Sequence, residues 1–339
     1  MPKPDSEAPG ADAGKKRWLH VGIAIAVLAG IAYWVDLKSV ANALLSLPGN
    51  ILLAALALAT CDRFLMAYKW RHLVLAGGAR LSFPSALRIY YQAVVSGRIV
   101  PTALGGDVVR AYFASLAGVP GGLAVSALVL EKLIALLASV TLALVGLFYL
   151  GSQLPADVDR TLILAVTGTA LLAGLAAVAL ALFAPAHKAG RAVLLRLMER
   201  WRFLRPLERI LGKVSRSLLE YRDKFGVLLQ NGLLAVAEHG VQLAKLGLIA
   251  AGLGIATDSL ALYAILAVAL FVRRLTGILE NWGLGEGSAI LMLVLFGISS
   301  ELAVALFVAN FAVSTVAILP GAVLFYTHPA GRPARDNGG

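Results

Sequence analysis

The sequence predicts an all-α polytopic membrane protein with about six full spans and two re-entrant, broken-helix segments. Hydrophobic residues make up 59% of the 339 positions, and charged residues only 14%, against about 25% in a soluble domain. Mean hydropathy is +0.82. A soluble core does not need this much apolar surface, so the chain belongs in a bilayer.

Six apolar runs are long enough to cross a hydrocarbon core of roughly 30 Å. They cover residues 18–35, 51–68, 133–150, 161–184, 225–252 and 301–326. The preceding residues 1–17 are rich in Pro, Gly and Ala and end in Lys-Lys-Arg, which predicts a disordered cytoplasmic tail. No small-residue cleavage site ends the first run, so we expect an uncleaved first span.

The net charge of +11 sets the topology, because it is concentrated in a few segments. Residues 185–224 hold eleven Lys/Arg against four Asp/Glu and are expected in the cytoplasm. This linker is either an amphipathic helix on anionic lipid or an ordinary basic loop. The N-terminal tail and the C-terminal tail, 327–339, are then cytoplasmic, and residues 36–50 form an external loop. The expected location is the cell inner (cytoplasmic) membrane.

Two segments begin and end on one side of the membrane under this topology. Residues 81–113 start and finish inside; 33 residues are too few for two spans of roughly 20 residues each. Residues 259–298 start and finish outside. Each is expected to be a re-entrant pair of short helices. The two transmembrane halves, 18–184 and 225–326, would then form an inverted-topology repeat with a transport site near the midplane.

The first break lies in RIVPTALGGDVVR, residues 98–110. Pro101 removes a backbone donor, and Gly105 and Gly106 let the chain turn and restart. Asp107 would cap the new helix, and Arg110 lies three residues further on the same face.

Two interpretations of the charges in this segment are open. Arg98 and Arg110 bind a lipid phosphate with Asp107 and Glu131 organising them, or Asp107 and Arg110 only neutralise each other.

The second break lies in RRLTGILENWGLGEGS, residues 273–288. Gly283 and Gly285 give the backbone freedom to break. Of Glu280 and Glu286, one is a candidate helix cap. The other is a candidate for proton coupling or for a contact to a headgroup amine. Alternatively, Arg274 and Glu280 pair structurally.

Further charges lie inside predicted spans. Glu238, Gln242 and Lys245 fall at i, i+4 and i+7, which predicts a polar stripe on one helix face. Asp62 and Arg63 lie well inside the second span. Charges at this depth are costly and usually face water or each other, so the sequence predicts a wet, charged interior.

Enzyme signatures are sparse. The sequence contains no HExxH, Walker A or GxSxG motif, and Gly-Gly-Asp follows no predicted strand. The single cysteine, Cys61, excludes an intrachain disulfide and a cysteine-built metal site. We therefore expect no cofactor, no metal and no nucleic-acid partner, and a transporter is favoured over an enzyme.

Three runs carry a family resemblance: KWRHLVLAGG (69–78), VSGRIVPTALGGDVVRAYFASLAGVP (95–120) and SALVLEKLIAL (126–136). Together with GILENWGLGEGSAILML (277–293), they resemble the lysylphosphatidylglycerol synthase transmembrane family. The resemblance extends over about residues 18–326 and implies a set of family positions. These are Pro101, Gly105, Gly106, Asp107, Arg110, Glu131, Gly283, Gly285 and Glu286.

The resemblance implies a flippase-domain-like membrane protein. The family includes the flippase half of multiple-peptide-resistance proteins and stand-alone proteins linked to lipid or lipid-glycan handling. This chain is expected to stand alone without the soluble aminoacyl-transferase domain, so lipid lysinylation is not expected. ENWGLGEG also lacks the proline of the family pattern, which leaves substrate identity open.

The leading hypothesis is a lipid flippase for a phospholipid or a polyprenyl-phosphate-linked lipid, with the headgroup at midplane arginines. One alternative is a membrane-embedded enzyme or enzyme subunit acting on a lipid-linked phosphate or glycan. Another is a non-catalytic scaffold of a lipid-synthesis complex. The expected partners are membrane lipids, and either a second copy of the chain or a lipid-synthesis enzyme.

Overall fold

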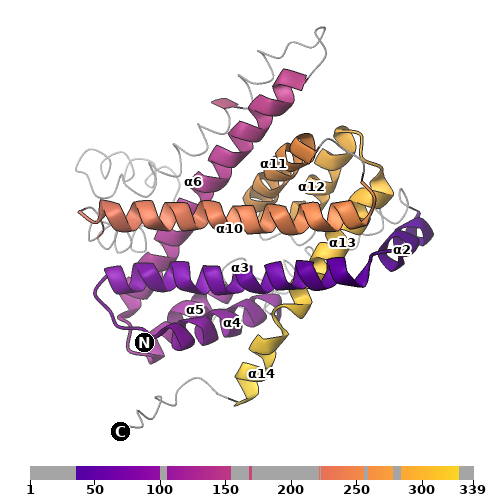
Figure 1. The fold of residues 1–339 in the computed structure, drawn as a ribbon. Helices are drawn as coiled ribbons and strands as arrows, with labels where there is room; N and C mark the ends of the chain where they lie inside the picture. Colours follow the sequence, from indigo (N-terminus) through magenta and orange to yellow (C-terminus); the bar gives the residue numbers. More distant parts are fainter. Residues whose placement is uncertain are drawn as a thin grey trace, which may run out of the picture.

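The computed structural model describes residues 36–99, 105–153, 168–169, 221, 223–255, 259–277 and 284–327. The elements identified in this part of the chain are all helices (Figure 1). They are α2 (Leu37–Leu45), α3 (Gly49–Ala76), α4 (Phe83–Ile99), α5 (Gly105–Leu116), α6 (Gly121–Gln153), α10 (Phe225–Gly252), α11 (Ser259–Gly277), α12 (Leu284–Leu295), α13 (Ser300–Val316) and α14 (Leu319–Thr327).

Four helical stretches are long and apolar enough to cross a membrane, so the protein is a multi-pass membrane protein. They are Gly49–Ala76, Gly121–Ser152, Phe225–Gly252 and Ser300–Leu324. Each contains or closely matches one of the predicted spans. The predicted spans 18–35 and 161–184, most of the linker 185–224 and the tail 1–17 lie outside the described residues.

The predicted external loop 36–50 contains a helix, α2. Its N-terminus is capped by Asp36, whose carboxylate accepts bonds from the Lys38 amide at 2.9 Å and the Ser39 hydroxyl at 2.6 Å. The Ser39 hydroxyl and the Lys38 amide hold the pKa of Asp36 below its usual value. A cap of this kind satisfies amide donors that a short helix otherwise leaves to water.

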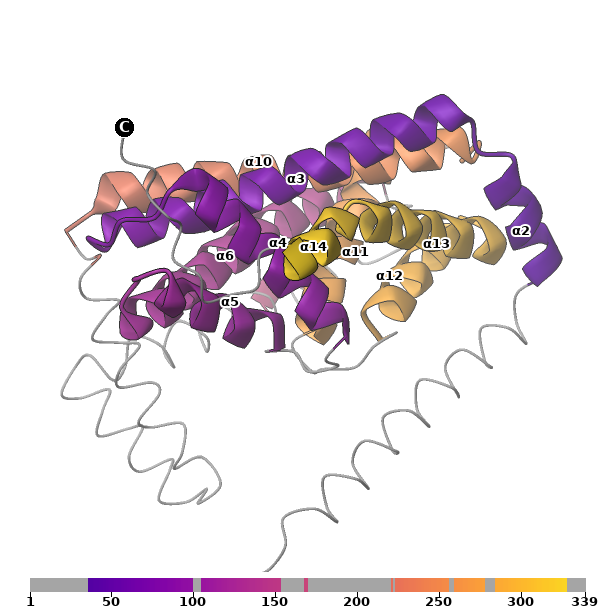
Figure 2. The same ribbon diagram turned by 90° about the horizontal axis from the view of Figure 1, so that it is seen from below.

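Each predicted broken segment contains two short helices packed against each other. In the first, a Cβ built on Gly106 of α5 would lie 2.9 Å from the carbonyl oxygen of Ala93 in α4. Only glycine permits this approach of two backbones. In the second, α11 and α12 also pack against each other (Figure 2). Re-entrant entry of these pairs into the membrane stays a prediction.

Helices α3 and α10 lie side by side and run antiparallel (Figures 1 and 2). At one end, the Asn231 amide of α10 donates to the carbonyl of Lys69 at 2.8 Å. At the other end, a Cβ on Gly252 would lie 2.9 Å from the Leu47 side chain, just before α3 begins. The two long helices therefore meet over their whole length, and the short helices pack around them.

The order of one long helix, two shorter helices that are not counted as spans and a further membrane-spanning stretch occurs twice. In the first unit these are α3, α4, α5 and α6, and in the second α10, α11, α12 and α13. The start of α4 follows the start of α3 at the same sequence separation as α11 follows α10. The start of α6 likewise follows that of α5 as α13 follows α12. Only the separation between the starts of the two short helices differs, and it is slightly larger in the second unit.

The helix ends repeat in the same way. Gly78 and Gly254 lie equally far from the starts of α3 and α10, and have φ of +94° and +69°. Gly118 and Gly297 lie equally far from the starts of α5 and α12, and have φ of +88° and +87°. In each case the following residue donates back to a carbonyl five residues earlier, as in a Schellman cap. The helices at these positions in the two units therefore end in the same way.

Gly146 gives a stability prediction, because α6 and α11 approach closely there. A Cβ at this position would lie 2.8 Å from the Ala264 carbonyl oxygen and 3.3 Å from its Cα. Gly146→Ala is expected to destabilise the protein by about 1–3 kcal/mol through overpacking, read as a lower thermal unfolding midpoint in detergent.

The matched control is Gly240→Ala, also in the interior of a membrane-spanning helix. A Cβ there meets no atom within 4 Å, so the gain in helix propensity, up to about 1 kcal/mol, is expected to raise the midpoint. Equal shifts in the same direction for both variants would contradict the close packing of α6 on α11.

Candidate functional site

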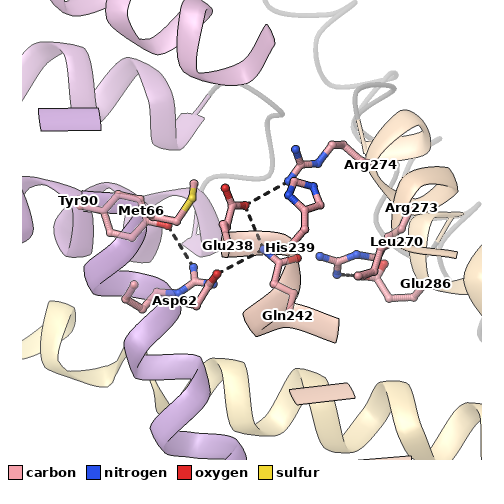
Figure 3. A pocket seen from close by; sticks show the side chains of 11 residues that line it. Asp62, Met66, Tyr90, Glu238, His239, Gln242, Leu270, Arg273, Arg274 and Glu286 are labelled. Carbon is pink, nitrogen blue, oxygen red and sulfur yellow. Dashed lines mark hydrogen bonds and ion pairs between the residues drawn. The ribbon is translucent and has the colours of Figure 1, made fainter. Parts of the chain in front are cut away.

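A pocket of about 420 Å³ opens beside the α3–α10 contact (Figure 3). Its walls come from α3, α4, α10, α11 and α12. The lining residues are Asp62, Arg63, Met66, Tyr90, Glu238, His239, Gln242, Leu270, Arg273, Arg274 and Glu286. Most of these side chains are charged or polar, in a molecule whose helices are otherwise apolar. The pocket therefore holds the wet, charged interior that the sequence predicts.

Glu238 of α10 is the most heavily bonded acid of the pocket. Its side chain is buried and forms an ion pair with the equally buried Lys69 of α3. Its other oxygen accepts from Arg274 of α11 at 3.3 Å and from Gln242 at 3.1 Å. Three donors from three helices thus neutralise one buried carboxylate, which meets the requirement for a charge in a low-dielectric interior.

Asp62 of α3 is the second buried acid, and it lies on the opposite side of Gln242. It pairs with the neighbouring Arg63. The Gln242 amide donates to Asp62 at 3.4 Å as well as to Glu238, so this one side chain spans the two carboxylates. Arg63 in turn donates to the Tyr90 hydroxyl of α4 at 3.3 Å.

The fourth ion pair of the pocket is more open to solvent. Arg273 of α11 lies 3.2 Å from Glu286 in the first turn of α12, and their side chains are 38% and 42% exposed. This pair joins the two short helices of the second broken segment. Because it is only partly buried, either charge can turn toward a ligand at little cost.

His239 presents one ring nitrogen to the pocket region. Its Nδ1 lies 2.6 Å from the Ala235 carbonyl oxygen. A carbonyl only accepts, so Nδ1 carries the hydrogen. Nε2 has no hydrogen-bond partner within the described part of the chain.

A second charged cluster lies between α5, α6 and the aromatic side chains of α3 and α4. Arg110 is buried and lies 3.0 Å from Glu131 and 3.3 Å from Asp107. Its guanidinium carbon also lies 5.4 Å from the Trp70 ring centre and 5.6 Å from the Tyr90 ring centre. Two carboxylates and two aromatic faces therefore surround the guanidinium.

Asp107 and Tyr90 connect this cluster to its surroundings. Asp107 pairs with Lys132, whose side chain is 54% exposed, in addition to Arg110. Tyr90 shares its ring with Arg110 and its hydroxyl with Arg63, so it links the second cluster to the pocket.

Comparison with known protein families decides the family. The model of the lysylphosphatidylglycerol synthase TM region matches residues 20–321 of the chain, which include both helical units. The protein belongs to the lysylphosphatidylglycerol synthase transmembrane family. No curated relative matches the sequence.

In this member of the lysylphosphatidylglycerol synthase transmembrane family, the predicted site residues separate into two groups. Arg274, Glu286, Glu238 and Gln242 come together in the pocket. Asp107, Arg110 and Glu131 form the second cluster.

The remaining predicted residues lie elsewhere or outside the described side chains. Lys245 of the polar stripe donates to the Ser314 hydroxyl of α13 at 3.1 Å. Gly105 and Gly285 lie in the first turns of α5 and α12, and Gly106 packs on α4. The side chain of Arg98, and Pro101, Glu280 and Gly283, lie outside the described residues.

Six polar residues of the pocket and its ion pairs were not among the predicted binding residues: Asp62, Arg63, Lys69, Tyr90, His239 and Arg273. A signal for three of them exists in the sequence. Asp62-Arg63 followed by Lys69 has the same spacing as Glu238-His239 followed by Lys245. No comparable pattern marks Tyr90, whose role depends on helix packing. Among the described residues, no group of three His, Cys, Asp or Glu side chains could hold a metal ion.

The Lys69–Glu238 pair predicts a large stability effect. Lys69→Met leaves a buried carboxylate with one cation fewer, and losing one partner of a buried pair costs about 3–5 kcal/mol. We expect a clear fall in the thermal midpoint of the detergent-solubilised protein. Lys132→Met, at an exposed pair, is the control and should cost no more than about 1 kcal/mol. A smaller effect at Lys69 than at Lys132 would contradict the pairing.

The Arg110–Glu131 contact can be tested separately by a double substitution. Arg110→Met is expected to destabilise the protein by about 3–5 kcal/mol, because Glu131 then keeps an uncompensated buried charge. Adding Glu131→Gln removes that charge and should recover most of the thermal midpoint. Failure of the double variant to exceed Arg110→Met would show that the two side chains do not stabilise each other.

Proposed function

We propose that the protein is a flippase for a lipid with an anionic, phosphate-bearing headgroup, either a phospholipid or a polyprenyl-phosphate-linked lipid. It belongs to a family of membrane proteins involved in lipid handling. In our proposal the headgroup enters the pocket between the two helical units, and the acyl or prenyl chains stay in the bilayer.

The observation that carries this proposal is the charge of the pocket. The pocket is lined by Arg63, Arg273 and Arg274. Lys69, which is not itself a lining residue, forms an ion pair with Glu238. These four cations meet three carboxylates, those of Asp62, Glu238 and Glu286. One net positive charge is left among these groups, and each guanidinium offers five N–H donors in the fork geometry that suits a phosphate.

In this proposal the pocket arginines bind the headgroup, and Arg110 does not. Arg110 lies against Glu131, Asp107 and two aromatic rings. Both carboxylates contact Nη2 of this buried guanidinium, so a phosphate would meet a charge that is already compensated. The interpretation in which Arg110 and Asp107 mainly neutralise each other is therefore favoured, extended by Glu131, and Arg110 becomes a residue that positions α5 and α6.

The repeated helical unit supports an inverted arrangement. Helices α3 and α10 begin the two units, are both long enough to span a membrane and run antiparallel. Equivalent helices that cross in opposite directions are expected of an inverted repeat, whose transport site lies between the repeats. The pocket has this position, because α3 and α4 of the first unit and α10, α11 and α12 of the second line it.

Transport can be measured with the purified protein in vesicles that carry labelled phosphatidylglycerol in one leaflet. Dithionite or another impermeant quencher reports the lipid that has crossed, with and without ion gradients. We expect the wild type to accelerate the movement of anionic lipids between the two leaflets. The acceleration should be larger than for a neutral diacylglycerol. A folded wild type that moves none of a broad lipid panel, including a polyprenyl phosphate, would overturn the proposal.

Arg273→Gln is the sharpest variant for this assay, since its ion pair is partly exposed and its loss should leave the fold intact. A hydrogen bond to a charged group is worth about 1.5–3 kcal/mol. We therefore expect about a tenfold to hundredfold higher half-saturating lipid concentration. Arg80→Gln, at an exposed arginine outside the pocket, is the matched control. Equal transport by the two variants would contradict a headgroup contact at Arg273.

A further inference from the structure

Helices α3 and α10 carry the same series of polar residues at the same places. Asp62 and Glu238 are each the fourteenth residue of their helix, and Lys69 and Lys245 are each the twenty-first. Each acid is followed by a basic residue, Arg63 or His239. The two units therefore place two acid–lysine sets face to face across one helix contact.

The antiparallel register relates two crossing pairs. Lys69 of α3 forms an ion pair with Glu238 of α10. Seven residues back along α3 is Asp62, and seven residues on along α10 is Lys245. Because the helices run antiparallel, these two seven-residue displacements point in the same direction along the helix pair. Each covers two turns, or roughly 10 Å. Asp62 and Lys245 therefore lie at opposed positions across the α3–α10 contact, as Lys69 and Glu238 do.

The two crossing pairs differ in this conformation. Glu238 receives Lys69, whereas Lys245 donates to Ser314 of α13 at 3.1 Å. Asp62 is paired with Arg63 of its own helix. The polar residues are thus repeated, but their contacts are asymmetric between the two units.

Asymmetric contacts between symmetric units have a physical meaning in a transporter. Alternating access in inverted repeats proceeds by rocking of one repeat against the other. The opposite-facing state is reached when the units exchange conformations, so a contact made by one unit is replaced by its equivalent in the other. We propose that an Asp62–Lys245 ion pair replaces the Lys69–Glu238 ion pair in the opposite conformation of the cycle.

This inference rests on the proposed transport function, and the exchange keeps both buried carboxylates paired. When Lys69 leaves, Glu238 keeps the Arg274 contact at 3.3 Å and Gln242 at 3.1 Å. Lys245 meanwhile reaches Asp62. The number of crossing ion pairs is one in each state, so neither state leaves an unpaired buried carboxylate, which would be strongly destabilising.

Charge exchange between the two positions tests the pair in the vesicle assay with labelled phosphatidylglycerol. Asp62→Lys and Lys245→Asp are each expected to reduce transport at least tenfold. The double variant Asp62→Lys/Lys245→Asp restores the pair and should recover transport to within a few-fold of wild type. Asp62→Lys combined with Lys38→Asp, on exposed α2, has the same net charge and should not recover.

Cross-linking gives a readout that does not depend on transport. Cys61→Ala removes the only native cysteine, and cysteines are then placed at positions 62 and 245, or at 69 and 238 as the reference pair. With a short bifunctional thiol reagent, both pairs are expected to cross-link in vesicles. Adding phosphatidylglycerol and an ion gradient should raise the yield at 62–245 and lower it at 69–238.

The outcomes separate the inference from the proposed function. If the wild type transports lipid but the charge exchange fails to restore it and 62–245 does not cross-link, the exchange of ion pairs is wrong and transport stands. If the wild type moves no lipid, the proposed function is wrong. A reciprocal change of the two cross-links would then still support the exchange, and its absence would overturn it.

Discussion

The burial of Glu238 between two membrane-spanning helices is the constraint on which the rest of the site depends. A carboxylate in a medium of low dielectric must be paired, and Lys69, Arg274 and Gln242 supply its partners from α3, α11 and α10. Meeting that requirement ties the two helical units together. It also brings the arginines of α11 to the wall of the pocket.

The second cluster also compensates buried charges, but around a buried cation. Arg110 is held between two carboxylates and two aromatic rings, and Lys132 balances Asp107 toward the exposed side. This cluster is closed, whereas the pocket is open. Tyr90 of α4 contacts Arg110 of the cluster and Arg63 of the pocket. A movement of α4 would therefore change the contacts of both arginines. In the proposed function, the open pocket receives the ligand and the closed cluster positions α5 and α6.

The polar residues recur at the same positions in the two helical units. Caps with positive-φ glycines recur after equivalent helices of the two units, and the acid–lysine sets recur with them. The equivalence is not complete: Glu131 and Asn310 are each the eleventh residue of their helix, and both are buried, but only one is charged.

Composition and the uncharged apolar runs were enough to predict the helical class and four of the spans. Local spacing was also enough for the Asp107–Arg110 pair, because residues three apart share a helix face. The Glu238–Gln242 contact follows from the same rule at a spacing of four.

Tertiary structure alone decided which charges of different helices meet. Lys69 and Glu238 are 169 residues apart, and Arg110 finds Glu131 on another helix. Periodicity shows which residues share a face, but the packing of helices determines what that face opposes. For this reason the pocket joins Asp62, Arg63 and Arg273 to residues that the sequence had already singled out, and separates them from Arg110.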